Sequence, residues 1–321
     1  MAEYFQKALL EDGGVVIGTN SEAFTPGMLA CDKSFVVPSI TDEDYISTLL
    51  DISIKENVSM IVSLFDIDLP YLALAKDLFA EHGITVAISS EKVIDISNDK
   101  WKTYNFLKEN NIDTPLTFVR LNDALVALED NNLRYPLFIK PRWGMGSIGI
   151  YKVDDKEELL FFYKYIQKQI QESYLSKMST SLDEAVLVQE FIAGKEYGID
   201  VLNDLNEKYI MSVSKEKLSM RSGETDAAIV VGIPALDELS MKISEELKHV
   251  GNLDVDVLFD GEKYYVLELN ARFGGGYPFT YLAGADFPDM LIKMLKNEFL
   301  DLPSVKVGLK AFKVISPVEY T

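Results

Sequence analysis

Two neighbouring segments near the end of the chain constrain the fold most. Residues 253–259 and 263–269 both have the composition of strands, and an Asp-Gly turn signal lies between them, which predicts an antiparallel hairpin. On the second strand, Glu268 and Asn270 are two residues apart, so their side chains leave the same face. Both side chains offer the hard oxygen ligands that magnesium prefers. The segment therefore predicts a metal-binding hairpin.

The place of Asp256 on this hairpin depends on the length of the turn. A two-residue turn would pair Asp256 with Tyr265 and put it on the face opposite Glu268. A three-residue loop, residues 260–262, would pair Asp256 with Val266 and bring it diagonal to Glu268. We expect the three-residue loop, which makes Asp256 a third metal ligand.

Arg272 follows the two ligands, and residues 274–276 are three glycines. If the strand continues, the Arg272 guanidinium lies on the ligand face, where it would contact phosphate oxygens. The glycines would let the backbone approach a substrate closely. The alternative is an edge hairpin whose acids only face water, and the accompanying arginine and glycines make it the weaker hypothesis.

Composition narrows the range of partners. The chain has 321 residues, enough for two or three compact subdomains, and its 48% apolar and 26% charged residues are ordinary for a globular protein. The formal net charge is −20 with no basic cluster, which argues against nucleic acid and anionic membranes as partners. An anionic substrate must then be held by a few locally placed cations.

Cysteine and histidine are too scarce for several chemistries. Cys31 is the only cysteine, and His82 and His249 are the only histidines, which argues against disulfides, zinc sites and a histidine base. The start of the chain has no apolar signal core, and no later run is long enough to cross a bilayer. We expect a cytoplasmic location.

Residues 1–98 alternate between strand and helix patterns, which predicts an α/β fold with a parallel sheet of Rossmann type. Such a sheet normally opens with a strand and a glycine loop, whereas this chain opens with a helical pattern. We therefore expect that the domain lacks its first strand or that the chain is truncated. The expected helices are 1–11, 41–56 and 69–81, and the expected strands are 15–18, 34–37, 59–64 and 84–88.

The rest of the chain mixes helices and strands around two further motifs. The expected helices are 99–110, 121–131, 156–171 and 286–297, and the expected strands are 137–140, 149–153 and 186–191.

Lys140 ends a buried strand and is followed by Gly144, Gly146 and Gly149. Burying the Lys140 ammonium is costly unless an anion lies beside it. The backbone N–H groups of a glycine-rich loop can approach phosphate oxygens. The spacing fits neither the Walker motif nor the dinucleotide fingerprint, and the glycines alone would equally fit a hairpin turn.

A third motif joins an apolar strand to a turn. Glu190 ends the strand, Phe191 and Ile192 follow, and Glu196 lies just beyond Ala193-Gly194. Backbone groups and carboxylates placed in this way could hold an adenine edge and ribose hydroxyls. Taken alone, the segment reads as a buried strand and turn.

Together and in this order, the segments resemble the ATP-grasp superfamily, most closely the branch that contains carbamoyl phosphate synthase and many carboxylate-amine ligases. The resemblance rests on Asp99-Lys100, Lys140 with its glycine loop, residues 190–196, Asp256 and Glu268-x-Asn270-x-Arg272. It implies three parts: a Rossmann-like pre-ATP-grasp domain at 1–98, a linker helix and small nucleotide-binding lid at 99–190, and a catalytic subdomain at 191–321.

The resemblance also implies ATP and two magnesium ions as cofactors, with manganese as a substitute. Asp256, Glu268 and Asn270 would bind the metal. Arg272 would neutralise the transferring phosphoryl group or the acyl phosphate formed from it. The residues expected to hold the nucleotide are Lys100, Lys140, Gly144, Gly146, Ser147, Glu190, Phe191, Ile192 and Glu196.

The substrate side is less defined. Members of the branch often carry a basic residue and an Arg-x-Gly-Glu segment where this chain has Lys215, Arg221 and Glu224, so the resemblance implies contact with substrate or phosphates; a solvated loop is an equal alternative. The aromatic side chains of Phe273, Tyr277 and Phe279 could line the substrate pocket or belong to the core.

The expected function is an ATP-dependent ligase. It would activate a small carboxylate as an acyl phosphate, which an amine attacks to form an amide with release of ADP and phosphate. The expected partners are a small carboxylate and an amine, and the resemblance is compatible with a homodimer. Two alternatives stay open: phosphorylation of bicarbonate or carbamate, and a non-catalytic nucleotide-binding module.

Overall fold

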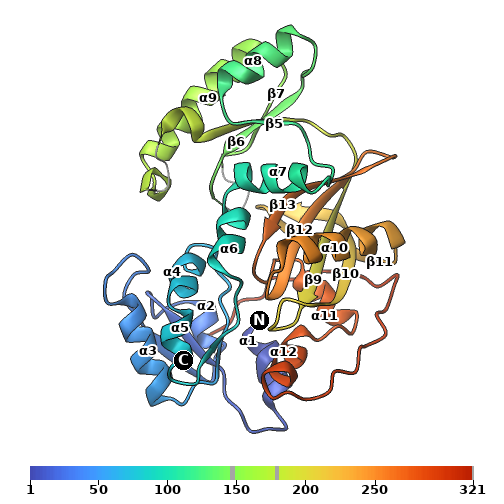
Figure 1. Cartoon of the computed structure of the whole chain (residues 1–321). Coiled ribbons are helices and arrows are strands. Elements are labelled where there is room, and N and C mark those ends of the chain that lie inside the picture. The colour runs from blue at the N-terminus through green and yellow to red at the C-terminus, as the bar shows by residue number, and fades with distance from the viewer. Residues whose placement is uncertain (145–148, 178–180, 320–321) are drawn as a thin grey trace.

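The computed structural model describes residues 1–144, 149–177 and 181–319. Three parts are visible in Figure 1: an N-terminal part in blue, a lid in green at the top, and a C-terminal part in yellow to red. The expected α/β fold is confirmed. Within the described ranges, no helix is both long and apolar enough to span a membrane.

The N-terminal part contains four short strands in two parallel pairs. β1 (Ile17–Asn20) pairs with β2 (Lys33–Val36), and β3 (Met60–Ile61) pairs with β4 (Thr85–Val86). The parallel pairing predicted for this part is confirmed, although the described strands form two separate pairs rather than one sheet. Its helices are α2 (Pro26–Leu29), α3 (Tyr45–Lys55), α4 (Leu69–Leu74), α5 (Lys76–Ala80) and α6 (Glu91–Asn98).

The first helix packs away from these strands. In α1 (Ala2–Leu9), the Tyr4 ring stacks on Tyr281 with 4.0 Å between centroids, and the Phe5 ring lies edge-on to Phe273 at 6.3 Å. Figure 1 shows α1 beside α12 of the C-terminal part. The first helix of the sequence thus packs in the hydrophobic core of the C-terminal part.

The lid is a four-stranded antiparallel sheet covered by helices α8 (Leu121–Glu129) and α9 (Lys156–Gln171). Asp155 caps α9 by accepting hydrogen bonds from the backbone N–H groups of Glu157 and Glu158. One apolar stripe of α9 packs into the lid core, as the helical spacing predicts. The strand order is β5 (Thr117–Phe118), β8 (Val186–Glu190), β6 (Leu137–Pro141) and β7 (Tyr151–Val153).

Helix α7 (Lys100–Glu109) links the N-terminal part to the lid, as expected for residues 99–110. Two short 3-10 turns, Tyr174–Lys177 and Leu182–Glu184, precede β8.

The C-terminal part is built on a six-stranded antiparallel sheet. One face packs on helix α10 (Pro234–Leu247) and on α6 and α7 around an apolar core that includes Ile199, Val255 and Val266. The strand order is β13 (Tyr264–Asn270), β12 (Gly251–Phe259), β9 (Lys195–Asn203), β10 (Tyr209–Arg221), β11 (Glu224–Val231) and β14 (Lys310–Phe312). Helices α11 (Tyr277–Leu282) and α12 (Phe287–Leu295) complete this part, and α12 confirms the helix expected at 286–297.

Candidate active site

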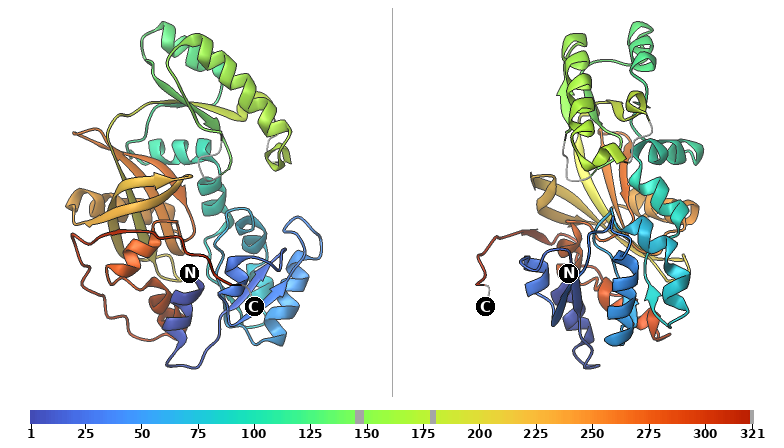
Figure 2. Two further views of the ribbon diagram at one scale, coloured as in Figure 1. Left: turned by 180° about the vertical axis from the view of Figure 1, so that it is seen from behind. Right: turned by 90° about the vertical axis from the view of Figure 1, so that its left-hand side faces the viewer.

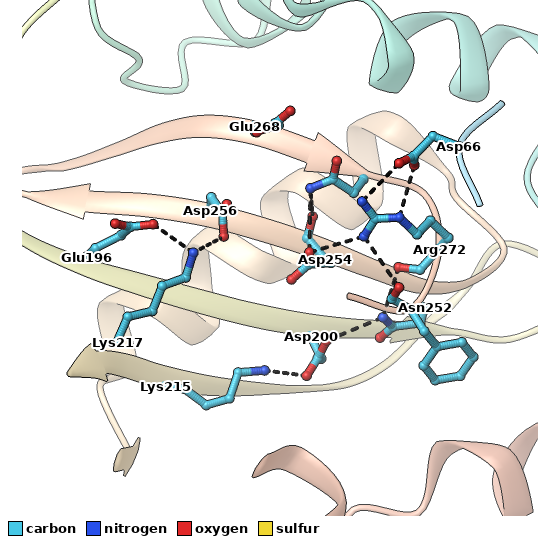
Figure 3. Close-up of polar contacts among 12 residues, drawn as sticks. Asp66, Glu196, Asp200, Lys215, Lys217, Asn252, Asp254, Asp256, Glu268 and Arg272 are labelled. Carbon is cyan, nitrogen blue, oxygen red and sulfur yellow. Dashed lines mark hydrogen bonds and ion pairs between the residues drawn. The ribbon is translucent and has the colours of Figure 1, made fainter. Parts of the chain in front are cut away.

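The central strands of the large sheet present apolar side chains on one face and polar side chains on the other, because successive side chains alternate. In β12, Leu253, Val255 and Val257 are fully buried in the core, so the residues between them point the other way. We call the second side the polar face; Figure 3 shows most of its side chains. Its members are Glu196, Gly198 and Asp200 of β9, Lys215 and Lys217 of β10, Asn252, Asp254 and Asp256 of β12, and Glu268 and Asn270 of β13.

The hairpin places Asp256 directly opposite Glu268. Neither turn considered from the sequence is correct, because Phe259 pairs with Tyr264 and four residues form the loop. A four-residue loop alone would put Asp256 opposite Leu267, on the wrong side. A β-bulge at Leu267 shifts the register by one residue and restores the shared face. The expected proximity of the two carboxylates is thus present through a different backbone.

Glu268 lies between cations from the linker helix and the lid. Lys100 Nζ is 2.9 Å from Glu268 Oε1 and also donates to the carbonyl oxygen of Gly144 at 2.6 Å. Burial alone would raise the pKa of Glu268, but Lys100 and Lys140 more than offset it and lower the pKa below its usual range. The carboxylate therefore stays ionised and available as a ligand.

Lys140 is buried in the lid sheet, where its ammonium donates to Gln189 Oε1 at 2.9 Å. Gln189 is held in turn by Thr117 Oγ1 at 2.9 Å. Burial lowers the pKa of Lys140 to about 8, although the charge of Glu268 opposes the shift. A buried ammonium without a direct carboxylate partner suits an anion such as a phosphate.

Lys217 is a site residue that the motif-based prediction misses. Its ammonium bridges two expected ligands, at 2.6 Å from Asp256 Oδ1 and 2.7 Å from Glu196 Oε1. Burial alone would lower the pKa of Lys217, but the two carboxylates raise it. Burial raises the pKa of Asp256, and Lys217 opposes that rise. The sequence signal that could have identified Lys217 is its two-residue spacing from Lys215, which places both lysines on one face of a strand.

Asp254 is a second residue that the prediction misses. It lies opposite both Asn270 and Asp200 in the sheet, and burial together with the charges of Asp256 and Asp200 raises its pKa to about 7. A Cβ at Gly274 would come within 2.2 Å of the Asp254 carboxylate. The glycine after the hairpin is thus needed because this acid occupies the space.

Arg272 lies beyond the end of β13, so the strand does not continue to it as expected. Its Nη1 is 3.4 Å from Asp254 Oδ2, and its Nε is 3.0 Å from Asp66 Oδ1 of the N-terminal part. Asp66 was not predicted, and no local motif marks it.

Lys215 lies on the polar face and is fully buried, and its ammonium contacts Asp200 and α11 rather than the expected metal ligands Asp256 and Glu268. Its ammonium pairs with Asp200 and donates to Thr280 Oγ1 of α11 at 2.9 Å, and both Lys215 and Asp200 are at most 1% exposed. Asn252 Nδ2 donates to the other Asp200 oxygen at 3.3 Å. Lys215 therefore has its charge neutralised inside the protein, which does not support direct contact with substrate.

The residues expected at the adenine lie where the lid joins the large sheet. Glu190 accepts a hydrogen bond from the Leu116 backbone N–H at 3.1 Å, and the Phe191 ring lies 5.3 Å from that of Phe138. Ile192 follows in the connection from β8 to β9. Gly194 allows this connection to lie against β12, since a Cβ there would be 2.0 Å from the Phe259 carbonyl oxygen. Gly146 and Ser147 lie outside the described residues.

Arg221 lies at the tip of the β10–β11 hairpin, where it pairs with Asp226. Arg221, Asp226 and Glu224 line a pocket of about 520 Å³. Glu224 pairs with Lys313 at 3.0 Å. A Cβ at Gly275 would contact the Glu224 side chain at 3.4 Å, so the glycine run borders this pocket. The pocket lining is Arg221, Ser222, Glu224, Asp226, Lys313, Val314 and Ile315.

The three aromatic residues after the hairpin are core residues. Phe273, Tyr277 and Phe279 are at most 6% exposed, and the Tyr277 hydroxyl donates to the Ala285 carbonyl oxygen at 3.2 Å. The core alternative is therefore correct for all three.

The donor set fits a magnesium ion that arrives with phosphates. Among residues 1–144, 149–177 and 181–319, no three His, Cys, Asp or Glu side chains form a metal-holding group by themselves. Asp256 and Glu268 would supply two carboxylates, and Asn270 would supply an amide oxygen. Magnesium at phosphate-transfer sites usually takes one or two carboxylates, with waters and phosphates filling the other positions. The residues present match that pattern and not an all-protein cage.

Two family descriptions match the chain. Residues 97–276 match the ATP-grasp domain, and residues 1–87 match the PylC-like, N-terminal domain.

Among curated proteins, the carbamoyl phosphate synthase large chain of Pseudothermotoga lettingae is 27% identical over 279 residues, which cover 83% of this chain and 23% of that protein. The arginine-specific large chain of Bacillus subtilis is 22% identical over 267 residues, covering 80% and 24%. The chain thus spans about a quarter of these relatives.

Solved structures share the fold. An L-amino acid ligase from Bacillus licheniformis superposes with a TM-score of 0.74 at 20% identity, covering 99% of this chain and 79% of that one. The biotin carboxylase domain of Hydrogenobacter thermophilus 2-oxoglutarate carboxylase, in complex with MgADP, ADP and bicarbonate, gives 0.74 at 17% identity, covering 96% and 70%. The matching domain spans more than half of the sequence, and the chain belongs to the ATP-grasp family.

Proposed function

We propose that this chain is an ATP-dependent ligase that activates a small carboxylate as an acyl phosphate. The observation that carries the proposal is the convergence of three parts of the chain: Asp256 and Glu268 from the large sheet, Lys100 from the linker, and Lys140 from the lid. Two carboxylates beside two lysines suit the binding of a metal and a polyphosphate together.

In this proposal the nucleotide lies between the lid and the polar face. Lys100, Lys140 and the glycine loop at 144–147 would hold the phosphates, and Glu190, Phe191, Ile192 and Glu196 would hold the adenosine. Asp256, Glu268 and Asn270 would hold two magnesium ions, for which manganese would substitute. Bound magnesium would supply charge neutralisation across the phosphates.

The chemistry needs no protein nucleophile. A substrate carboxylate oxygen attacks the γ-phosphorus, the bond to ADP breaks, and an acyl phosphate forms; an amine then attacks the acyl carbon, and phosphate and a proton leave. Arg272 would face the charge that develops on the transferred group. Lys217 would keep Asp256 and Glu196 in place, and Lys215 would support the sheet beneath them.

On the substrate side, we propose that the pocket at Arg221 and Glu224 receives an organic substrate. It presents a guanidinium and a carboxylate next to the glycine run at 274–276, and both charges have partners that solvent can replace. A homodimer and a cytoplasmic location remain predictions from the sequence.

A second candidate is the phosphorylation of bicarbonate or carbamate. It is favoured by the similarity to carbamoyl phosphate synthase large chains, of which this chain spans about a quarter.

The test is phosphate release from Mg-ATP with panels of amino acids, other small carboxylates and amines. The expected result is turnover that needs both an acid and an amine, and that Glu268→Gln lowers by about 100-fold or more, as when a group that stabilises transition-state charge is removed. Glu262→Gln, an exposed acid in the turn of the same hairpin, should keep full activity.

Two other outcomes would contradict the ligase proposal. Bicarbonate-dependent ADP formation without an organic acid would favour the second candidate. ATP binding without turnover above Glu268→Gln on any panel would favour a nucleotide-binding module.

A further inference from the structure

Asp66 of the N-terminal part reaches into the candidate active site. It lies in the loop that leaves β3, at the carboxyl end of a parallel strand pair, where α/β folds commonly place ligand-binding loops. Its Oδ1 lies 3.0 Å from Arg272 Nε, and its Oδ2 accepts a hydrogen bond from Arg272 Nη2 at 3.0 Å. The two residues are 206 positions apart, and Figure 3 shows the paired contact.

The loop that carries Asp66 is fixed from within and from outside. The Ser63 hydroxyl donates to Asp68 and accepts from the Phe65 backbone N–H at 3.1 Å. The Asp66 carbonyl oxygen accepts a hydrogen bond from Asn98 Nδ2 at 2.8 Å. Asn98 ends α6, directly before the Asp99-Lys100 segment. The loop is therefore held in place by a hydrogen bond to the end of α6, which directly precedes Asp99 and Lys100.

The backbone of Arg272 is hydrogen-bonded to Asn270 and to the Asn252 side chain, but it lies outside the sheet. Strand β13 ends at Asn270, so the sheet hydrogen bonds do not orient its side chain. Its Nη1 has two weaker contacts, at 3.4 Å to Asp254 Oδ2 and 3.4 Å to the Phe273 carbonyl oxygen. Without Asp66, the buried Asp254 would be the strongest remaining partner and would draw the guanidinium onto the sheet.

The geometry leaves one end of the guanidinium for an incoming anion. Asp66 occupies the edge formed by Nε and Nη2, and a planar guanidinium held on one edge has a fixed orientation. At the other end, Nη1 is held only by its two 3.4 Å contacts to Asp254 Oδ2 and the Phe273 carbonyl oxygen, so an incoming anion would displace only weak partners there.

We infer that Asp66 is a positioning residue that fixes the Arg272 guanidinium toward the oxyanion of the reacting carboxylate or phosphoryl group. The inference rests on the proposed function for its catalytic meaning, and it makes the N-terminal part a contributor to the reaction. Asp66 acts through Arg272, so the loss of both residues should cost no more than the loss of Arg272 alone.

A matched control exists in the same part of the molecule. Glu56 pairs with Lys33 at 2.6 Å, and its side chain is 13% exposed, as is that of Asp66. Glu56→Gln therefore removes an equally covered carboxylate of the N-terminal part, away from the site.

The first readout needs no turnover. In ¹⁵N NMR, the Arg272 Nη2–H signal, identified by its loss in Arg272→Lys, should be protected from exchange with water in the wild type and in Glu56→Gln, since this N–H donates to Asp66 Oδ2. Asp66→Asn should lose this protection at least tenfold. Persistence of the protection in Asp66→Asn would overturn the positioning role, even if the chain were not a ligase.

The second readout uses the acid and amine found active in the panel. Asp66→Asn should lower kcat by 10- to 100-fold with the KM for ATP within about twofold of the wild type. In an Arg272→Met background it should cause no further loss. An additive loss, or a loss no greater than that of Glu56→Gln, would overturn the inference. If Asp66→Asn proves too unstable to purify, Asp66→Glu replaces it with the same expected readouts, since the charge moves by one methylene.

Discussion

Two lysines on strand β10 show how the same residue type serves different ends. Lys215 and Lys217 are two positions apart on the polar face. Lys215 pairs with Asp200 of the neighbouring strand β9, and Lys217 pairs with Asp256 of β12, the strand beyond β9. Lys215 and its partner Asp200 are at most 1% exposed, whereas the partner of Lys217, Asp256, keeps 23% of its side chain exposed. Figure 3 shows both pairs on adjacent parts of one sheet.

The difference comes from what covers each pair. Thr280 of α11 donates to Asp200 and accepts from Lys215, which closes that end of the sheet. No such contact covers Lys217 in the described chain, and Gly198 leaves room beside it, since a Cβ there would lie 3.2 Å from its Cε. The buried pair of Lys215 and Asp200 cannot exchange its partners. The pair of Lys217 and Asp256 reaches solvent, so its carboxylate can bind a metal ion and its ammonium a phosphate.

The largest expected effect is on the sealed pair. Lys215→Met should lower the free energy of unfolding by about 3–5 kcal/mol, because it leaves the Asp200 carboxylate buried without its cation. Urea denaturation followed by circular dichroism measures this loss.

The double variant Lys215→Met with Asp200→Leu is the control. It should recover most of the lost stability, because neither buried charge remains. If the single variant were as stable as the wild type, solvent would have to reach Asp200, and the contrast between the two pairs would fail.

His249 sharpens the comparison, because it is buried and, among the described residues, its ring contacts a single hydrogen-bond partner, a backbone carbonyl. Its Nε2 lies 3.1 Å from the Val201 oxygen, and burial lowers its pKa to about 4 from the ordinary 6.5. The unfolded chain therefore takes up this proton first as the pH falls. The His249 contribution is complete above pH 6.5 and is lost as the pH falls toward 4, by about 3 kcal/mol in total.

Unfolding of His249→Gln across pH 4 to 7 tests this value. The difference in stability between wild type and variant should change over that window. His82→Gln, which alters the exposed histidine, should follow the wild type. A constant difference between wild type and His249→Gln would show that the imidazole has the same pKa in the folded and the unfolded chain, which would contradict the lowered pKa.

The smallest expected effect is on the open pair. Lys217→Met should lower turnover by 10- to 100-fold, about 1.4–2.7 kcal/mol, since Asp256 and Glu196 lose their common cation. Its unfolding free energy should fall by less than half of the loss in Lys215→Met, because both remaining carboxylates reach solvent. An equal loss of stability in the two variants would remove the distinction.

The elements that local signals define best were predicted from the sequence. Helix 156–171 has a capping Asp155 and an apolar stripe, and the structure has the same bounds. The two strands of the metal-binding hairpin are also confirmed. The turn between them was wrong, because a bulge at Leu267 compensates for the longer loop, and no propensity marks that residue.

The candidate site follows the same division. The expected proximity of Asp256 and Glu268 is present, although a bulge at Leu267 produces it, and Lys100 and Lys140 lie beside them as the order of motifs implied. Lys217, Asp254 and Asp66 were missed. The first two lie on strand positions whose alternation could have identified them, whereas Asp66 approaches from another part of the chain.

The residues printed in the chain were enough to predict the family, the candidate oxygen ligands and cations, and the alternation of side chains along each strand, because a period of two is a local property of the backbone. Which acid contacts Arg272, which lysine is buried beneath α11, and how the hairpin comes into register depend on the folded arrangement. Burial and ion pairing depend on segments that meet in space from distant positions in the chain. Two lysines with the same local pattern can therefore have opposite roles.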